Sequence, residues 1–474
     1  MQLKSFVFTV LLFGYFAQPI FSQNKLGKYG DGPDSIAPVG ILPKLSDEQL
    51  MEVVQRQTFR FFWHGAHPVS GMALERSNEV RADYYWDFLN ESWGEPNFAS
   101  GTFGPDACAV GGTGFGIMAT IVAANRGWIG RDTAVRRLTK IANFLTKADA
   151  FHGIYPHFMD GNTGKAIPFD RLDDGGDIVE TSYLLMGFLC AREYFDRDTP
   201  REKFLRNRIN AMWNAANWNW HTNGGEAKLY WHWSPNNGFD MNFPVWGWNE
   251  CLITYVMAAS SPGHAISKKA YEGGWTGSPG WRNGKEYFGI KLPLGNYDMG
   301  GPLFFEQYSF LGIDPTHLRD SLGIDYWEQC RNHTLINRAY CIQNPKKYKG
   351  YSAQCWGLTA GDSFIGYAAH CPEVDLGVIQ PTAAISSMPY TPKESLEAMR
   401  YFYEKLGGKI WSDYGFVDGF SESHDWYAKS HLAIDQGPIV GMIENYRTGL
   451  LWKLFMKIPE VQAGMGKLGF KMRG

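Results

Sequence analysis

The densest group of acidic residues in the sequence lies between residues 170 and 180, where Asp173, Asp177 and Glu180 are separated by intervals of four and three residues. On a continuous helix this spacing would place the three carboxylates on one face. Two glycines directly before Asp177 favour a later helix start, with Asp173 in the preceding loop. Carboxylates close together without a cation shift one another's pKa, which suits acid–base catalysis. A structural interpretation stays open, because Asp177 and Glu180 before an apolar run also form the pattern of a helix capping box.

Two further carboxyl groups, Glu250 and Asp435, stand before other apolar segments. Glu250 follows Trp246 and Trp248, so we expect partial desolvation, which raises a carboxyl pKa and keeps a proton available near neutral pH. A glutamate stabilised by a helix macrodipole would have a lowered pKa instead. Asp435 stands just before Pro438, where it could equally be an ordinary helix cap. Together with the first group, these residues form a candidate acidic site.

Tryptophans concentrated between residues 218 and 248 indicate the class of ligand. Asparagines and histidines are interleaved with them: Trp218, Trp220, Trp231, Trp233, Trp246 and Trp248 alternate with Asn217, Asn219, His221 and His232. Sugar rings have apolar C–H faces and polar edges, so flat rings among amides, imidazoles and carboxylates match them. We predict that Trp231, Trp246 and Trp248 bind sugar, and we expect at least half of these tryptophans to fill the core.

Other chemistries are disfavoured by the sequence. It contains no GxSxG, HExxH, GxxxxGK[ST], GxGxxG or CxxC motif, and its 12 histidines form no metal-ligand set. The glycine-rich segment 111–116 is interpreted as a packed helix entry, not a phosphate loop. Because 45 Lys+Arg face 48 Asp+Glu, with a formal net charge of −3, a broad nucleic-acid-binding surface is excluded. We therefore predict no metal, no other cofactor and no nucleic-acid partner.

Helices must position these residues, because long helical patterns recur between loops rich in Gly, Pro and Trp. Three segments are apolar nearly all round, namely 113–125, 180–194 and 249–259, and the other expected helices are 46–62, 133–147, 201–216, 391–407 and 439–456. A helix buried on every side needs an outer layer, so the pattern predicts an all-α fold with an inner ring of helices inside an outer ring, an α/α toroid. If the inner helices begin at one end, their acidic starts would form one pocket.

The expected domain organisation is simple. Residues 1–22 have the charged start, apolar run and small cleavage-site residue of a secretory signal peptide, so a periplasmic or secreted protein is expected, with a retained membrane anchor as the weaker alternative. Residues 23–44 are expected to be a flexible lead-in, and residues 45–474 a single domain. Of the seven cysteines, Cys330 with Cys341, or Cys355 with Cys371, could pair, or all could stay free thiols.

Several motifs resemble one known family in the order in which they occur. They are segments 112–115, 173–181, 246–250, 355–360, 415–420 and 433–438. From about residue 45 onward the chain resembles the bacterial glucoamylase-like proteins grouped as glycoside hydrolase family 144. The resemblance implies an (α/α)6 barrel that hydrolyses β-1,2-glucan with inversion, and it does not support the α-1,4 specificity of the older label. The acidic residues that match the family's substrate pocket are Asp173, Asp177, Glu180, Glu250 and Asp435.

Our hypothesis is that Glu250 is the general acid and that Asp435 or Asp177 is the base, while Asp173 and Glu180 bind sugar or tune pKa values. Members of the family cleave either internally or by releasing sophorose from the non-reducing end, and the residues leave this choice open. A monomer is expected. The alternatives are a non-catalytic β-glucan-binding protein of an uptake system, and a glycosidase or lyase for another linkage on the same barrel.

Overall fold

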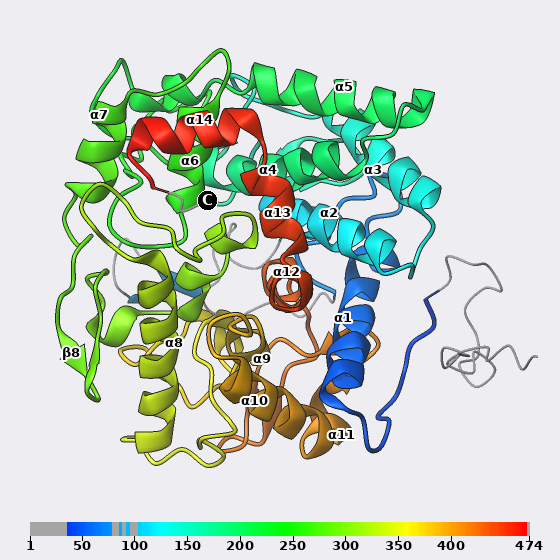
Figure 1. Cartoon of the computed structure of the whole chain (residues 1–474), viewed down its shortest axis with the longest axis vertical. Helices are drawn as coiled ribbons and strands as arrows, with labels where there is room; N and C mark the ends of the chain where they lie inside the picture. Colours follow the sequence, from blue (N-terminus) through cyan, green and yellow to red (C-terminus); the bar gives the residue numbers. More distant parts are fainter. Residues whose placement is uncertain (1–35, 78–84, 88–91, 95–102, 472–474) are drawn as a thin grey trace, which may run out of the picture.

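The computed structural model describes residues 36–77, 85–87, 92–94 and 103–471, and it is mostly helical (Figure 1). The α-helices are α1 (Asp47–Trp63), α2 (Val110–Asn125), α3 (Arg131–Leu145), α4 (Ile178–Tyr194), α5 (Pro200–Ala215), α6 (Leu252–Ser260), α7 (Lys268–Tyr271), α8 (Tyr326–Gln343), α9 (Pro381–Ile385), α10 (Pro392–Glu404), α11 (Gly407–Ile410), α12 (Ala433–Thr448), α13 (Leu450–Met456) and α14 (Pro459–Leu468). Shorter helical turns are η2 (Trp218–Thr222), η3 (Glu272–Thr276), η4 (Asp298–Gly300), η5 (Leu303–Glu306) and η6 (Ser309–Leu311). The predicted all-α class is therefore confirmed as a mostly helical fold.

The strands are two to four residues long, and they lie in the connections between helices. They are β1 (Tyr85–Asp87), β2 (Ser92–Gly94), β3 (Ala107–Ala109), β4 (Phe158–Asp160), β5 (Ala166–Ile167), β6 (Gly176–Asp177), β7 (His232–Trp233), β8 (Glu286–Tyr287), β9 (Ile290–Lys291), β10 (Ala360–Ser363), β11 (Gly366–Ala369), β12 (Trp411–Ser412), β13 (Gly415–Phe416), β14 (Phe420–Ser421) and β15 (Trp426–Tyr427). The largest sheet has the order β10-β11-β1-β2, in which β1 and β11 are parallel. β6 and β7 pair antiparallel with Asp177 opposite His232, and this register matters for the site.

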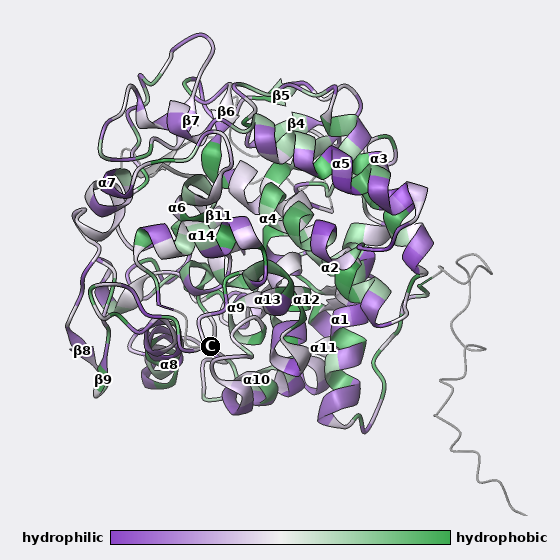
Figure 2. Cartoon of the chain, turned by 45° about the horizontal axis from the view of Figure 1, so that its top comes forward, coloured by the Kyte–Doolittle hydropathy of each residue, from purple (hydrophilic) through white to green (hydrophobic). Residues whose placement is uncertain are grey.

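The central helices pack side by side. α2 lies between α4 and α12, α6 packs on α4, and η6 contacts both α6 and α12 (Figure 1). α3 and α5 cover α2 and α4 from outside, α1 packs against α2 and α12, and α10 covers α9. Hydrophobic residues are concentrated on α4 and α6, and hydrophilic residues on α3, α5 and α8 (Figure 2). The larger hydrophobic core is built around α2, α4 and α6, and a second one lies between α1, α9, α10 and α12.

Glycines allow α2 and α4 to approach closely. A Cβ on Gly114 would lie 2.1 Å from the carbonyl oxygen of Tyr183, and a Cβ on Gly187 would lie 2.3 Å from the carbonyl oxygen of Gly114. No side chain fits in these positions, so the two backbones are in direct contact. The interpretation of segment 111–116 as a packing element is confirmed.

The observed N-terminal cap matches the predicted one at α1 but not at α10. The predicted capping box at Ser46 is present, with Gln49 as its partner. Thr391 precedes α10 but caps no backbone N–H, because its hydroxyl donates to the carbonyl of Ser387 in the preceding turn. The predicted end of this helix at 407–408 is wrong: α10 ends at Glu404, and Gly407 begins α11.

The last long helix also differs from the prediction. Instead of one helix over 439–456, α12 begins at Ala433 and contains Pro438, and it ends before Gly449. Gly449 has a φ of 66°, a left-handed conformation that favours glycine and separates α12 from α13. Asp435 therefore lies within the first turn of a helix and not ahead of it.

The described residues include the last part of the lead-in and all seven cysteines. The predicted signal peptide (residues 1–22) and most of the lead-in lie outside the described residues. The described part of the lead-in, 36–44, contains no helix or strand and contacts the domain: the guanidinium of Arg60 donates to the carbonyl of Ile36, and the indole of Trp411 donates to the carbonyl of Val39. All seven cysteines are described, and all are buried free thiols. Among the described residues, no helix is both long and apolar enough to cross a membrane.

Candidate active site

Asp177 is the N-cap of α4 and is fully buried. Its Oδ1 accepts hydrogen bonds from the backbone N–H groups of Val179 and Glu180, both at 2.9 Å. Its Oδ2 accepts from Nδ1 of His157 at 2.8 Å and from Nε1 of Trp231 at 3.1 Å. Burial alone would raise the pKa of Asp177, but the hydrogen bond from His157 and the neighbouring histidine charges lower it. The capping interpretation is thus confirmed for Asp177, which is held as an anion.

Glu180 does not complete a capping box. Its Oε2 accepts a hydrogen bond from the backbone N–H of Gly111 at 2.8 Å, at the start of the neighbouring helix α2. Burial raises the pKa of Glu180 to about 7. The negative charge of Asp177 also raises this pKa, whereas the positive charge of His157 lowers it. The carboxyl group therefore joins the starts of two helices and titrates near neutrality.

Two histidines neutralise this first acidic cluster, which we define as Asp173, Asp177 and Glu180. Nδ1 of His232 lies 3.1 Å from Oδ2 of Asp173 and 3.7 Å from Oδ2 of Asp177, and Nε2 of His157 lies 3.9 Å from Oε1 of Glu180. Burial would lower the pKa of His157, but the charges of Glu180 and Asp177 raise it to about 9. The pKa of His232 is raised for the same kind of reason, with Asp173 as its main partner. Two histidines with raised pKa values therefore face three carboxyl groups.

Glu250 lies in the turn just before α6 and is half-buried. Its carbonyl oxygen accepts hydrogen bonds from the hydroxyl groups of Tyr183 and Ser309, which fix the turn. Burial raises the pKa of its carboxyl group to about 7, and the charges of Glu180 and Asp177 act in the same direction. The expectation of a desolvated carboxyl is confirmed, and the alternative of a pKa lowered by the macrodipole is wrong because desolvation is the larger effect.

Asp435 belongs to a second acidic cluster, which we define as Asp362, Asp418 and Asp435. Its carboxyl group is buried in the first turn of α12, and the charge that affects it most is that of Asp418. No described residue donates a hydrogen bond to either carboxyl oxygen of Asp435. The capping alternative is wrong, because Leu432 is the N-cap residue of α12 and Asp435 caps no backbone group. Burial and the Asp418 charge raise the pKa of Asp435, and burial raises that of Asp418 to about 7.

Tyr308 connects the two clusters. Its pKa is raised well above the ordinary value, first by burial and then by the charges of Asp435, Glu250 and Glu180. Its hydroxyl has no hydrogen-bond partner among the described residues. The charges of carboxyl groups from the starts of α4, α6 and α12 therefore all act on one buried tyrosine.

The three tryptophans predicted to bind sugar have different environments. Trp231 is half-buried and donates to Asp177 in the site, and Trp246 is exposed. Trp248 is only 2% exposed and donates through Nε1 to Oε1 of Glu306 at 2.9 Å. Trp248 is therefore a core residue, and the prediction that it binds sugar is corrected. The interleaved sequence pattern could not separate these cases, because it does not encode which side each ring faces.

One group of side chains has the geometry of a possible metal site. Ligand atoms of His157, Asp173 and Asp177 lie within 4.8 Å of one another. However, the Asp177 oxygens already accept hydrogen bonds from His157, Trp231 and the start of α4, and Asp173 faces His232. The donor set fits a network in which protonated histidines supply the positive charge.

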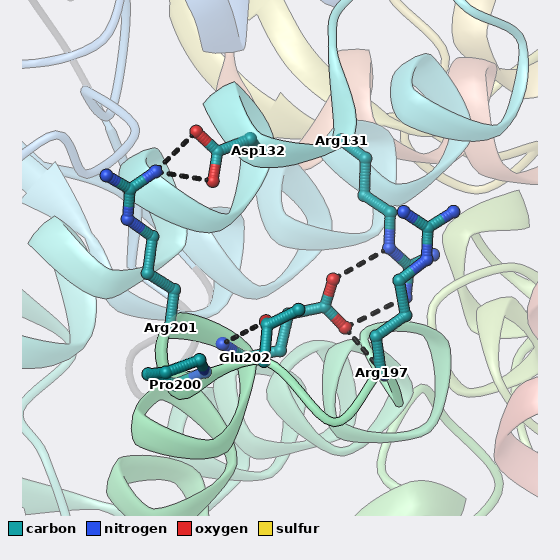
Figure 3. A pocket seen from close by; sticks show the side chains of 7 residues that line it. Arg131, Asp132, Arg197, Pro200, Arg201 and Glu202 are labelled. Carbon is teal, nitrogen blue, oxygen red and sulfur yellow. Dashed lines mark hydrogen bonds and ion pairs between the residues drawn. The ribbon is translucent and has the colours of Figure 1, made fainter.

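A separate cavity of about 380 Å³ lies between α3 and α5 (Figure 3). Two of its three arginines pair with acidic neighbours: Arg131 with Glu202, and Arg201 with Asp132. None of the acidic residues of the two clusters lines this cavity. It is therefore distinct from the acidic site.

The structure adds four functional candidates that the sequence did not single out: His157, Tyr308, Asp362 and Asp418. Asp418 lies within segment 415–420, one of the segments that carry the family resemblance, so a signal existed for it. Nothing in the local sequence distinguishes His157 or Tyr308 from other aromatic residues.

Comparisons with known proteins agree on one family. A family model described as "Putative glucoamylase" matches residues 242–459. The exo β-1,2-glucooligosaccharide sophorohydrolase (non-reducing end) of Parabacteroides distasonis is 40% identical over 445 residues, which cover 90% of this chain; the chain spans only 58% of that protein's length. The crystal structure of a "putative glucoamylase" from Bacteroides uniformis is 52% identical, with a TM-score of 0.84, and 91% of this chain and 99% of that chain are covered. An endo-β-1,2-glucanase from Chitinophaga pinensis, in complex with sophorotriose and glucose, is 50% identical with a TM-score of 0.83, covering 90% and 99%.

Proposed function

The chain belongs to the bacterial glucoamylase-like family, glycoside hydrolase family 144, and from this membership we propose that it hydrolyses the β-1,2-glucosidic bonds of β-1,2-glucan and its oligosaccharides. The observation that carries the proposal is the 50% identity to the Chitinophaga pinensis endo-β-1,2-glucanase across 99% of that enzyme's chain. The acidic site supports it, because hydrolysis of a glycosidic bond needs one protonated and one ionised carboxyl group.

We assign the site to one end of an (α/α)6 barrel. In this arrangement the inner layer includes α2, α4, α6, α9 and α12, and the outer layer includes α1, α3, α5, α8, α10 and α14, which packs on α6. The ring of contacts from α2 through α4, α6 and η6 to α12 and back to α2 supports the assignment. It also explains why residues far apart in the chain meet, since the first turns of the inner helices share one end.

Glu250 is the general acid of the proposed reaction. It is half-buried, and with a pKa of about 7 it keeps a proton available near neutral pH. Its proton passes to the glycosidic oxygen as the bond from that oxygen to C1 breaks. Water attacks C1 from the opposite face, so the configuration at C1 is inverted.

Asp435 is the better of the two candidate bases. Asp177 already accepts four hydrogen bonds and has a lowered pKa, which makes it a weak proton acceptor. Asp435 accepts no hydrogen bond from a described residue through its carboxyl group, and its charge acts on the same tyrosine as that of Glu250. It takes the proton of the attacking water, either directly or through a substrate hydroxyl. Asp173 and Glu180 bind sugar hydroxyls, with Trp231 and Trp246 against the ring faces.

Incubation of the protein with linear β-1,2-glucan, followed by chromatography of the products over time, tests this proposal. The higher identity to the endo enzyme favours a mixture of short oligosaccharides early in the reaction, whereas sophorose as the sole early product would assign exo action. Tight binding without cleavage would favour the glucan-binding alternative, and cleavage of another β-glucan only would favour a different linkage. Proton NMR of the first product should show the anomer opposite to the substrate's β configuration.

We also propose that the protein is exported to the periplasm or the medium and acts as a monomer. The charged and apolar pattern of residues 1–22 supports export. Cell fractionation and gel filtration of the mature protein test the two statements, and recovery of the protein in the cytosol or as a stable dimer would overturn them.

A further inference from the structure

One buried carboxyl group outside both acidic clusters contacts the turn that carries Glu250. Glu306, the last residue of η5, is 0% exposed. Its Oε1 accepts hydrogen bonds from Nε1 of Trp248 and Nε2 of Gln329, and Nδ1 of His333 lies at the same distance, 2.9 Å in all three cases. Trp248 precedes Glu250 by only two residues. Glu306 therefore links this turn to helix α8.

The contacts of Glu306 on α8 are themselves fixed. Gln329 and His333 are four residues apart, so they lie on one face of the helix, and both are fully buried. Oε1 of Gln329 accepts from the backbone N–H of Leu294 at 2.9 Å, and Nε2 of His333 donates to the carbonyl of Gly301 at 3.1 Å. Because a carbonyl oxygen can only accept, the second proton that His333 needs lies between its Nδ1 and Oε1 of Glu306.

Ser309 holds the same turn from its other end. Its hydroxyl donates to the carbonyl of Glu250 and accepts from the backbone N–H of Ile253 at 2.9 Å, in the first turn of α6. The hydroxyl of Tyr183 also donates to the Glu250 carbonyl, at 3.3 Å. Since Ser309 follows Glu306 by three residues, one short segment, 306–309, contacts the chain both before Glu250 and at Glu250 itself.

We propose that Glu306 and Ser309 are positioning residues for Glu250: segment 306–309 is a frame that holds the turn 248–250, keeps water from loosening it, and directs the acid toward the glycosidic oxygen. This inference rests on the proposed function, in which Glu250 protonates that oxygen. Glu306 acts through the indole of Trp248, and Ser309 acts through the backbone of Glu250. Neither touches the sugar or the attacking water in this account.

Two substitutions weaken the frame at its two ends. In Glu306→Gln, the amide can turn its oxygen toward Trp248 and Gln329 or its N–H group toward Nδ1 of His333, but it cannot do both, because one oxygen of Glu306 makes all three contacts. Ser309→Ala removes the hydroxyl from the Glu250 carbonyl.

A matched control is Thr222→Ala, at the end of η2. The hydroxyl of Thr222 is also buried, donates to the carbonyl of Asn219 at 2.8 Å and accepts from the backbone N–H of Gly225 at 3.0 Å. It therefore has the same pattern of hydrogen bonds as Ser309, without a contact to the turn of Glu250.

The first test needs no substrate and isolates the titration of Glu250. Burial raises the pKa of Glu250 from 4.5 to about 7, so its contribution to stability is present below pH 4.5 and is lost as pH rises through about 7. The difference between the wild type and Glu250→Gln in thermal unfolding across pH measures this contribution. The same difference is then measured in the Ser309→Ala, Glu306→Gln and Thr222→Ala backgrounds. The other titratable groups that interact electrostatically with Glu250 are present in both members of each pair: Asp177, Glu180, Tyr183, Cys251 and Tyr308.

Ser309→Ala and Glu306→Gln should reduce this difference, because a loosened turn hydrates the carboxyl group and lowers its pKa. Thr222→Ala should lower Tm but leave the difference unchanged. A difference of wild-type size in both frame variants would overturn the proposal. If Glu306→Gln does not fold, Trp248→Phe replaces it, since this change removes the indole donor and keeps Glu306.

The second test uses β-1,2-glucan. Ser309→Ala and Glu306→Gln should lower kcat about tenfold with less than about a twofold change in KM, because the acid is misplaced and the sugar contacts are not. The basic limb of kcat/KM, where Glu250 loses its proton, should move to lower pH. A lower Tm with wild-type kcat and an unmoved limb would overturn the positioning role. If the wild type itself does not cleave the glucan, the proposed function fails, and the unfolding experiment still decides whether the frame sets the environment of Glu250.

Discussion

The two acidic clusters contain the same kind of groups but differ in the cations beside them. In the first, Asp173, Asp177 and Glu180 face two histidines, and Asp177 has four hydrogen-bond donors. In the second, Asp418 and Asp435 are equally buried, and the nearby guanidinium of Arg76 is engaged by Glu75 and Asp362. Burial raises carboxyl pKa values in both, so the donors decide the protonation state. The first cluster keeps Asp177 as an anion, and the second keeps Asp418 and Asp435 with raised pKa values.

Glu250 shares features with both acidic clusters. It is near the anions of the first cluster, and its pKa of about 7 reflects burial first, with no histidine among its causes. Asp177, with four donors, is the group whose pKa is lowered, whereas Glu180, Glu250 and Asp418, with fewer donors, have pKa values raised to about 7 by burial.

The largest expected effect follows from removal of the acid. Glu250→Gln should lower kcat on β-1,2-glucan by about 1,000-fold or more while the protein still folds, because the amide cannot protonate the leaving oxygen. Initial rates and a thermal melt measure both properties. Glu272→Gln, at an exposed position that pairs with Lys268, is the matched control and should keep wild-type turnover. If the Glu250→Gln variant retains most of its turnover, Glu250 is not the acid.

The second prediction separates the two candidate bases. Asp435→Asn should lose activity by about 100-fold or more without loss of stability, because no described donor depends on its charge. Asp177→Asn should instead lower the free energy of unfolding by about 1–3 kcal/mol, because a helix cap and a charged hydrogen bond are weakened. Urea unfolding and kcat, measured on both variants, check the contrast. A stable and inactive Asp177 variant beside an active Asp435 variant would reverse the assignment.

The third prediction concerns stability at alkaline pH. The pKa of His157 is raised from 6.5 to about 9, so its ion pairs stabilise the folded state fully below pH 6.5, and this contribution is lost as pH rises through about 9. His157→Gln should remove this decline and destabilise the protein by about 2 kcal/mol at neutral pH. Chemical unfolding between neutral and alkaline pH measures both effects.

Burial raises the pKa of Asp418 to about 7, so stability should also fall as pH rises through that value, below the range in which His157 acts. The substitutions His157→Gln and Asp418→Asn should therefore flatten different parts of the same stability profile. If His157→Gln leaves the alkaline decline unchanged, the histidine is not the charge that stabilises the first cluster.

Local sequence patterns predicted the buried helices and the acidic residues at their starts. Contacts between distant segments determine the features of the site that were not predicted. The cap at Ser46, the buried character of α2 and α4, and the acidic helix starts depend on neighbouring residues. The electrostatic coupling of Asp418 with Asp435 depends instead on how a loop after β13 approaches the first turn of α12, and no periodicity in the sequence encodes that approach. The partner of Asp177 was missed for the same reason, since His157 comes from the segment before β4.

The smallest expected effects test the aromatic residues, where the sequence could not distinguish surface from core. Trp246→Ala should raise KM for the glucan about fivefold with little change in kcat or Tm, because an exposed ring contributes about 1 kcal/mol of sugar contact. Trp248→Phe should leave KM nearly unchanged and cost about 1–3 kcal/mol of stability, because the buried Glu306 loses an indole donor. Steady-state kinetics and denaturant unfolding on both variants decide the matter. If Trp248→Phe increases KM with unchanged stability, Trp248 belongs to the sugar-binding surface. If Trp246→Ala lowers stability without an effect on KM, Trp246 does not belong to that surface.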